Sequence, residues 1–178
     1  MSILKVAHMG HPVLRERARP LARSEITELA TQRLIDDMFE TMREYQGIGL
    51  AAPQVHKNLR LFVAGVEDPD AVLPPVVMIN PEITPIGQKI EEDWEGCLSI
   101  PDIRGQVPRP NEIQIRALDR HGQELAMTAS GFAARVIQHE TDHLDGILFF
   151  DRMKSFKNLA FLEEYSRYWE KEEAPSKA

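Results

Sequence analysis

The sequence feature that most constrains the fold is the run His139-Glu140-Thr141-Asp142-His143, with two histidines four residues apart. Residues at this spacing lie one turn apart on one face of an α-helix, so the run predicts a helix that holds both imidazoles over one metal ion. Because Glu140 directly follows His139, its side chain projects from a neighbouring part of the helix surface. From there it can take a proton from a water molecule that the metal activates. The run therefore predicts a metal-dependent hydrolase with Glu140 as its general base.

A catalytic metal site commonly has three protein ligands, and the sequence offers three sources for the third. One class of zinc protease uses a histidine six residues beyond the second one, but here that position is Phe149. Another class uses a glutamate on a following helix, and Glu163 or Glu164 is available for that role. The last source is Cys97, because a thiolate is a strong ligand for zinc and ferrous iron.

Hydrophobic periodicity predicts a mixture of helices and strands. Helices are expected over residues 24–45, 130–144 and 155–172, with Gly47 and Gly146 as stops after the first two. Strands are expected over 59–66, 76–79, 112–118 and 124–128, with an extended segment over 82–92 that is broken near residue 85. The order lacks regular strand–helix alternation, so we expect the α+β class. We expect one catalytic domain over 1–170 and a polar C-terminal tail over 171–178.

Charge and cysteine content limit the partners and the cellular compartments that are expected for this chain. The formal net charge of −7 argues against a general nucleic-acid binder, so no DNA partner is expected. Cys97 is the only cysteine, so no internal disulfide can form, which fits a reducing compartment. No apolar run reaches the ~18 residues of a membrane helix, and no secretory or transit signal is evident. We expect a cytoplasmic protein without a membrane contact, and an origin in an organelle stays open.

Two more segments carry residue types that suit a hydrolase. The segment Gly47-Ile48-Gly49-Leu50-Ala51-Ala52-Pro53-Gln54 predicts a turn between a helix and a strand, and its final amide is able to donate a hydrogen bond to an oxyanion. The segment Glu95-Gly96-Cys97-Leu98-Ser99 places a glycine beside the cysteine, which allows the backbone to come close to a ligand.

Together with the histidine run, these segments resemble the peptide deformylase family. The family pattern reads G-φ-G-φ-A-A-x-Q, then E-G-C-L-S, then Q-H-E-x-D-H-L-x-G, where φ is an apolar residue. The chain matches every fixed position in order, in 47–54, 95–99 and 138–146, and the resemblance covers nearly the whole chain. It implies an α+β fold with antiparallel strands packed around a central helix that carries the H-E-x-x-H motif. It also implies the reaction: removal of the N-formyl group from the N-terminal methionine of newly synthesised polypeptides, with release of formate.

The resemblance implies a role for each matching residue. The implied metal ligands are Cys97, His139 and His143. The ion is most often ferrous iron in this family, and zinc, nickel or cobalt can substitute. Glu140 is the implied general base, while the side chain of Gln54 and the backbone N–H of Leu98 form the implied oxyanion hole. The residues whose backbone groups would pair with the substrate are Ile48, Gly49 and Gly96.

Other residues are expected around the side chain of the substrate methionine. Phe132, Arg135 and Val136 lie near the metal face by helical spacing, so they are candidates for the pocket wall. Many family members have an apolar residue in place of Arg135, and we expect its stem to pack while its guanidinium reaches water at the pocket rim. We expect Asp142 either to orient an imidazole or to be a solvated helix charge, and Trp94 to cover one side of the cleft.

Two other functions and one further partner stay open. A zinc peptidase would use His139, His143 and Glu163, and would keep its metal when Cys97 is replaced. A metal-binding protein without turnover would have no need of Glu140. Some family members dock near the ribosomal exit tunnel through a C-terminal helix. Several glutamates in the C-terminal region of this chain disfavour RNA, so only a weak ribosome association is considered.

Overall fold

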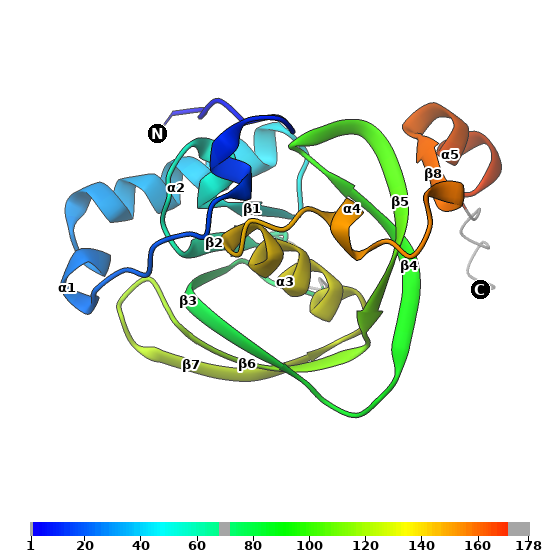
Figure 1. The fold of residues 1–178 in the computed structure, drawn as a ribbon. Helices are drawn as coiled ribbons and strands as arrows, with labels where there is room; N and C mark the ends of the chain where they lie inside the picture. The colour runs from blue at the N-terminus through cyan, green and yellow to red at the C-terminus, as the bar shows by residue number, and fades with distance from the viewer. Residues whose placement is uncertain (1, 68–71, 171–178) are drawn as a thin grey trace, which may run out of the picture.

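The computed structural model describes residues 2–67 and 72–170, which form helices and two antiparallel sheets (Figure 1). This mixture confirms the α+β class. The expected tail over 171–178 lies outside the described residues. In the described part of the chain, no helix combines the length and apolarity that crossing a membrane requires.

The larger sheet has five strands in the order β1-β2-β3-β6-β7, with every neighbouring pair antiparallel. The strands are β1 Gly49–Ala51, β2 Leu61–Ala64, β3 Val76–Pro85, β6 Glu112–Leu118 and β7 Glu124–Ser130. In β6, the side chains of Ile113, Ile115 and Ala117 are buried and alternate with more exposed ones, which is the pattern of a strand with one face on the core. β1 ends this sheet, and no described strand pairs with its outer edge.

The smaller sheet has three strands in the order β4-β5-β8. The strands are β4 Ile90–Cys97, β5 Ile100–Pro110 and β8 Leu159–Phe161. β4 and β5 form a hairpin whose register shifts between Glu95 and Cys97, and β4 is an edge strand like β1. The sequence did not predict β5, which contains three prolines, a residue that interrupts most strand patterns.

The first predicted helix is interrupted near its start. It consists of α1 Arg23–Ile26 and α2 Leu29–Glu44, because the backbone of Glu28 is extended and begins the second helix. The buried face of α2 includes Ile35, Met38 and Met42, as an amphipathic helix requires. The predicted helix over 130–144 is confirmed as α3 Gly131–Leu144, and Gly146 follows it with a φ of 72°.

The predicted C-terminal helix is wrong over its first half. Leu159–Phe161 is extended because it pairs with residues 103–105 of β5, so hydrogen bonds at the sheet edge replace those of a helix. Among the residues of this range that the structure describes, which end at 170, only α5 Leu162–Tyr168 is α-helical. The remaining short elements are the 3₁₀ turns Pro12–Arg15, Ala52–Val55 and Phe156–Asn158, and the helix α4 Phe149–Arg152.

α3 is buried along most of its length and contacts strands of both sheets, among them β1, β2, β5, β6 and β7. One side of the helix packs through Ala134 and Ile137 into the core with Phe62 and Met78. The histidines of α3 are therefore held in the interior of the protein.

Candidate metal centre

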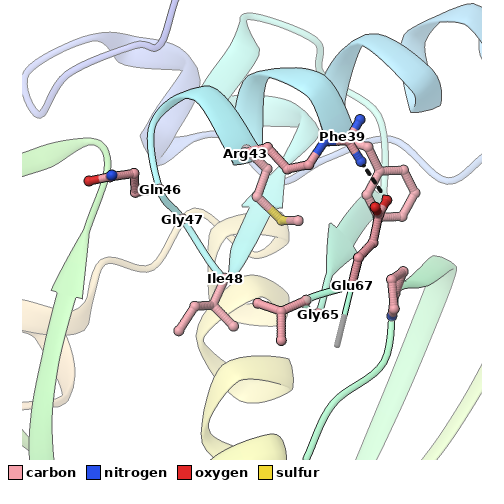
Figure 2. A pocket seen from close by; sticks show the side chains of 10 residues that line it. Phe39, Arg43, Gln46, Gly47, Ile48, Gly65 and Glu67 are labelled. Atoms are coloured by element: carbon pink, nitrogen blue, oxygen red, sulfur yellow. Dashed lines mark hydrogen bonds and ion pairs between the residues drawn. The ribbon is translucent and has the colours of Figure 1, made fainter. Parts of the chain in front are cut away.

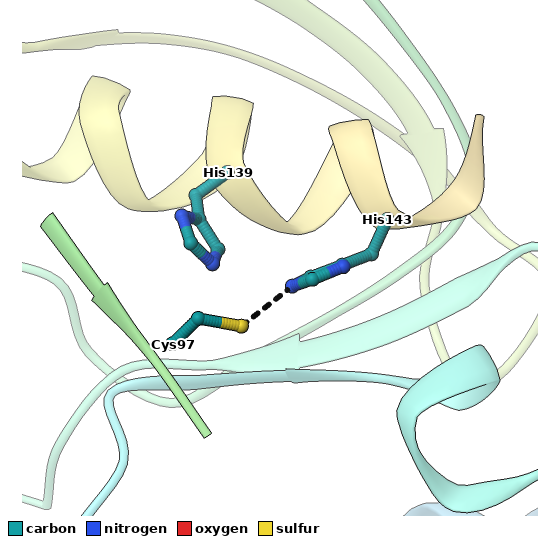
Figure 3. Close-up of side chains that lie close together, drawn as sticks. All are labelled: Cys97, His139 and His143. Carbon is teal, nitrogen blue, oxygen red and sulfur yellow. Dashed lines mark hydrogen bonds between the residues drawn. The ribbon is translucent and has the colours of Figure 1, made fainter. Parts of the chain in front are cut away.

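Three potential ligands converge between α3 and the end of β4. Figure 3 shows Cys97 pointing from its strand toward His139 and His143, which project from consecutive turns of the helix. One ligand atom from each residue lies within 4.8 Å of the others, and all three residues are buried. The Sγ atom of Cys97 is 3.2 Å from Nε2 of His143. The structure thus brings together the three residues that the sequence indicated as metal ligands.

The donor atoms of this cluster fit a divalent metal ion. In a tetrahedral zinc site, bonds of about 2.3 Å to sulfur and about 2.1 Å to nitrogen put the two ligand atoms roughly 3.5 Å apart, close to the observed 3.2 Å between Cys97 and His143. Although burial opposes it, hydrogen bonds with Cys97 and Glu95 raise the pKa of His139 well above its ordinary value. Burial lowers the pKa of His143, which leaves its imidazole neutral and able to ligate.

Glu95 fixes the ring of His139. Its Oε2 atom lies 2.9 Å from Nδ1 of His139, which leaves Nε2 to face the cluster. Burial alone would raise the pKa of Glu95, but hydrogen bonds from His139 and Arg109 hold it well below its ordinary value. From the sequence alone, Glu95 had no expected role beyond its place in the motif. Its neighbour Cys97 was the only signal that could have pointed to it.

Asp142 belongs to a buried ion-pair network. It is buried and accepts hydrogen bonds from Arg109 at 2.8 Å and from Arg152 at 2.7 Å. The expectations that it orients an imidazole or is a solvated helix charge are both wrong. Arg109 joins this aspartate to Glu95, because its Nε and Nη2 atoms donate to Glu95 at 2.6 and 2.9 Å. Nothing in the sequence around Arg109 indicated these contacts, since its partners are distant along the chain.

The guanidinium of Arg135 is not at a solvent-exposed rim. Only 7% of the residue is exposed, and its Nη1 atom donates to Glu95 and to the carbonyl of Val107, both at 2.8 Å. The prediction that this guanidinium reaches water is therefore wrong. A buried carboxylate within reach attracts the arginine inward, and this compensates for the loss of hydration.

The amide of Gln54 has a fixed orientation beside the cluster. Its Oε1 atom accepts the N–H of Ala51 at 2.8 Å, so the NH₂ group must point the other way. That Nε2 atom lies 3.2 Å from Oγ of Ser99 and 3.6 Å from Sγ of Cys97. A donor from Gln54 is thus held next to the potential metal ligands.

Glu140 is buried and lacks one hydrogen-bond partner. Among the described residues, nothing bonds its Oε2 atom, and burial raises its pKa to about 7. Its carboxylate lies against Gly49, where an added Cβ atom would be 2.3 Å from Oε1. Glycine at this position is therefore what leaves room for the glutamate beside β1.

The start of β1 lies beside the segment that carries Cys97. An added Cβ atom on Gly47 would be 2.9 Å from Cδ1 of Leu98. The carbonyl of Ile48 accepts the N–H of Gly65 at 2.8 Å. A pocket of about 300 Å³ lies next to this strand. Gly47 and Ile48 are among its lining residues (Figure 2), and none of the three potential metal ligands is. Its other lining residues come from α2, from Gln46 just after this helix, and from the segments around residues 65–67 and 75.

The residues predicted to bind the substrate differ in exposure. Phe132 is 51% exposed and Ile48 is 37% exposed, so both can contact a ligand. Val136 is buried and packs in the core cluster with Ile137. Gly96 lies directly under the guanidinium of Arg104, since an added Cβ atom would be 2.2 Å from its Nη1 atom.

Two further predictions are wrong. Trp94 packs against Tyr165 and Trp169, with ring centroids 5.0 and 5.7 Å apart, so it lies under the C-terminal helix instead of covering the cleft. Glu163 is on α5, where it pairs with Arg167 at 3.0 Å and is not part of the ligand cluster. The zinc-peptidase ligand set with Glu163 therefore does not form in this structure.

Comparisons with known proteins agree on one family. The family model described as polypeptide deformylase matches residues 3–159. A peptide deformylase of Leptospira biflexa is 41% identical over 170 residues, covering 92% of this chain and 95% of that protein. Peptide deformylase 1 of Bordetella pertussis is 44% identical over 163 residues, covering 89% of this chain and 92% of that protein.

Solved structures are similar over most of the chain as well. A crystal structure of the class I type b peptide deformylase of Acinetobacter baumannii with Met-Ala-Ser bound has a TM-score of 0.81 and 40% identity, and the match covers 86% of this chain and all (100%) of that one. The peptide deformylase of Thermotoga maritima has a TM-score of 0.80 and 39% identity, with coverage of 87% and 100%.

Proposed function

Because the chain belongs to the peptide deformylase family, hydrolases that remove the N-formyl group from newly made polypeptides, we propose that Cys97, His139 and His143 bind its catalytic metal ion. The observation that carries this assignment is the convergence of one thiol and two imidazoles, all buried, within 4.8 Å. A divalent ion bound there would polarise the formyl carbonyl and lower the pKa of a water molecule toward ~7.

Glu140 is proposed as the general base and later the general acid. It removes a proton from the attacking water and passes that proton to the amine that leaves when the formamide bond breaks. Its buried carboxylate has an oxygen without a partner among the described residues, and its pKa of about 7 suits proton exchange near neutral pH. A cation bound at the cluster would counteract this effect of burial and favour the ionised base.

Gln54 and the backbone N–H of Leu98 are proposed to stabilise the oxyanion that forms on the formyl group. The bond from Ala51 keeps the Gln54 amide turned toward the cluster, so its donor is in place before the substrate binds. One such donor contributes about 3 kcal/mol to transition-state stabilisation. Leu98 follows Cys97 directly, which supports its place in the same hole.

The substrate peptide is proposed to bind as an extended strand between β1 and β4. Both are edge strands, and the contact of Gly47 with Leu98 supports a close approach of the two. Because the carbonyl of Ile48 is already bonded to Gly65, Gly49 is the residue of β1 best able to pair with the peptide. Gly96 is the corresponding residue proposed on β4.

The side chain of the substrate methionine is proposed to contact Ile48 and Phe132, which are partly exposed, with Val136 behind them. Arg135 is buried and bonded to Glu95, so it is not proposed to touch the methionine. The Acinetobacter baumannii relative has Met-Ala-Ser bound, which supports a peptide as the ligand proposed here.

We also propose the family's arrangement of one catalytic domain over 1–170, with antiparallel strands around the helix that carries the H-E-x-x-H motif. The burial of α3 and its contacts with both sheets support this arrangement. We propose Fe²⁺ as the native ion, since one thiolate and two imidazoles suit it, with Zn²⁺, Ni²⁺ or Co²⁺ as substitutes. We place the reaction in the cytoplasm, where Cys97 stays reduced. A weak ribosome association remains a prediction that the exposed Glu163 and Glu164 of α5 disfavour.

The test is formate release from formyl-Met-Ala-Ser by protein purified anaerobically with iron, beside the variants Cys97→Ala and Glu163→Ala. We expect fast release by the parent, loss of metal and activity in Cys97→Ala, and little change in Glu163→Ala. Full metal content and activity in Cys97→Ala would reject the ligand assignment. Absence of release by the metal-loaded parent would reject the proposed reaction at this site.

A further inference from the structure

Arg135 is one helical turn before His139 on α3, and its guanidinium is bonded to three groups. The Nη1 atom donates to Glu95 Oε1 and to the carbonyl of Val107, both at 2.8 Å. The Nη2 atom donates to the carbonyl of Glu91 at 2.9 Å. All three acceptors belong to the hairpin of β4 and β5, whereas the arginine belongs to α3. The side chain therefore links the helix with the histidines to the hairpin with Cys97.

The link passes through the same carboxylate that orients His139. The Oε1 atom of Glu95 accepts from Arg109 Nε at 2.6 Å as well as from Arg135, and Oε2 accepts from Arg109 Nη2 and lies 2.9 Å from His139 Nδ1. A carboxylate with both oxygens occupied in this way has no freedom to rotate. A planar guanidinium fixes its acceptors at set angles, which a flexible ammonium group does not do.

We propose that Arg135 is a positioning residue of the metal centre. Through Glu95 it fixes the ring of His139, and through the two carbonyls it fixes the separation between α3 and the strand that carries Cys97. This inference rests on the metal site proposed above. It predicts that the affinity and the coordination geometry of the metal both depend on a side chain that touches no ligand atom.

Arg60 offers a matched control within the same chain. Its side chain is also largely buried, with 15% exposed. It donates to the carboxylate of Asp145 at 2.7 Å and to the carbonyls of Leu144 and Pro81 at 3.4 and 3.2 Å. It thus joins the other end of α3 to the larger sheet through one carboxylate and two carbonyls, without contacting Glu95. Replacing Arg60 therefore measures how much stability is lost when a buried arginine that links two elements is removed, without any change at Glu95.

The experiment compares Co²⁺ binding by the parent, Arg135→Met, Arg135→Lys and Arg60→Met. Dissociation constants come from competition with a chelator, and the visible bands of the bound cobalt report its coordination geometry. We expect Arg135→Met to bind Co²⁺ about 10–100-fold more weakly, because loss of a group that orients a ligand typically has this effect. Its bands should shift as well. Arg60→Met should lose thermal stability but keep the parent's affinity and bands.

Arg135→Lys keeps the positive charge but is unable to hold three acceptors in one plane, so it should also bind Co²⁺ more weakly and show shifted bands. It keeps the inference testable if Arg135→Met does not fold. Parent-like affinity and bands in the Arg135 variants, or equal changes in Arg60→Met, would overturn the inference. The sulfur-to-cobalt band of the parent should vanish in Cys97→Ala. If it is absent from the parent, the ligand assignment itself fails, and the inference fails with it.

Discussion

Two buried glutamates lie close to His139, and their surroundings differ in nearly every respect. Glu95 has both oxygens occupied by donors from two arginines and an imidazole. Those contacts outweigh burial and hold its pKa well below the ordinary value. Glu140 has an oxygen without a partner in the described residues, and burial raises its pKa to about 7.

Glutamate can therefore serve two purposes within a single site, depending on its hydrogen-bond partners. A carboxylate whose lone pairs are all used stays ionised and holds its neighbours in place. A carboxylate left without partners is costly to ionise, so it can accept and release a proton near neutral pH. Glu95 is therefore assigned to structure and Glu140 to proton transfer. Four predictions test this division of roles.

The first prediction concerns the activity of Glu140→Gln. Removing a general base lowers the rate by about 10²–10⁴-fold, so kcat/KM for formyl-Met-Ala-Ser should fall by that factor. The metal content, measured by atomic absorption, should stay at the parent's level, because this residue is not among the three potential ligands. A variant that loses its metal in step with its activity would contradict the division of roles.

The second prediction concerns the stability of Glu95→Gln. This change leaves the guanidinium groups of Arg109 and Arg135 without their shared anion, and breaking a buried ion pair costs about 3–5 kcal/mol. The free energy of unfolding of the metal-free variant, from urea denaturation, should fall by that amount. Glu92→Gln is the control, since Glu92 is an exposed glutamate on the same strand, 3.5 Å from Lys154. It should change the free energy by no more than ~0.5 kcal/mol, and equal effects at the two positions would refute the prediction.

The third prediction concerns the space that Gly49 leaves for Glu140. A methyl group there would meet the carboxylate at 2.3 Å and displace it. A displacement of about 1 Å can lower a rate by up to ~10²-fold, so Gly49→Ala should lose activity while keeping its metal. Gly49→Ala should reduce the activity much less when Glu140 is already replaced by Gln, because the side chain that it displaces then no longer transfers the proton. Additive losses in the double variant would show that the glycine acts in another way.

The fourth prediction concerns the stability of the metal-free protein as a function of pH. The folded pKa of Glu140, about 7, lies above its ordinary value of 4.5. Its contribution to stability is therefore present at low pH and is lost as the pH rises from 4.5 to 7. The parent should lose about 1–3 kcal/mol over this range relative to Glu140→Gln. Denaturation curves of both proteins at pH 5 and pH 8 measure this difference, and parallel pH profiles would be the contrary result.

The three potential metal ligands could be identified from the sequence because the motifs that contain them are local. The spacing of His139 and His143 requires only a helix, which residues 130–144 favour on their own. Cys97 was identified by its motif and lies where that motif implies. The hairpin of β6 and β7 was likewise readable from its alternation and its turn at residues 119–122.

The partners of the charged residues did not follow from the sequence, because they are set by contacts between distant segments. Arg135 meets Glu95 across 40 positions, and Arg109 meets Asp142 across 33. No periodicity encodes such a pair. The prediction of a helix over 155–161 was wrong for a related reason. Leu159–Phe161 pairs with the edge of β5, and a helical pattern in the sequence does not predict such a distant backbone partner.

The open edges of β1 and β4 limit when a substrate chain can bind. An edge strand recognises the backbone of a partner, and that backbone is the same in every protein that a cell makes. The partner must, however, be extended and have its own N–H and C=O groups unused. A chain whose first residues have entered a helix or a sheet no longer meets this condition. The proposed binding mode therefore limits the reaction to the interval between the appearance of the N-terminus and the folding of the segment behind it.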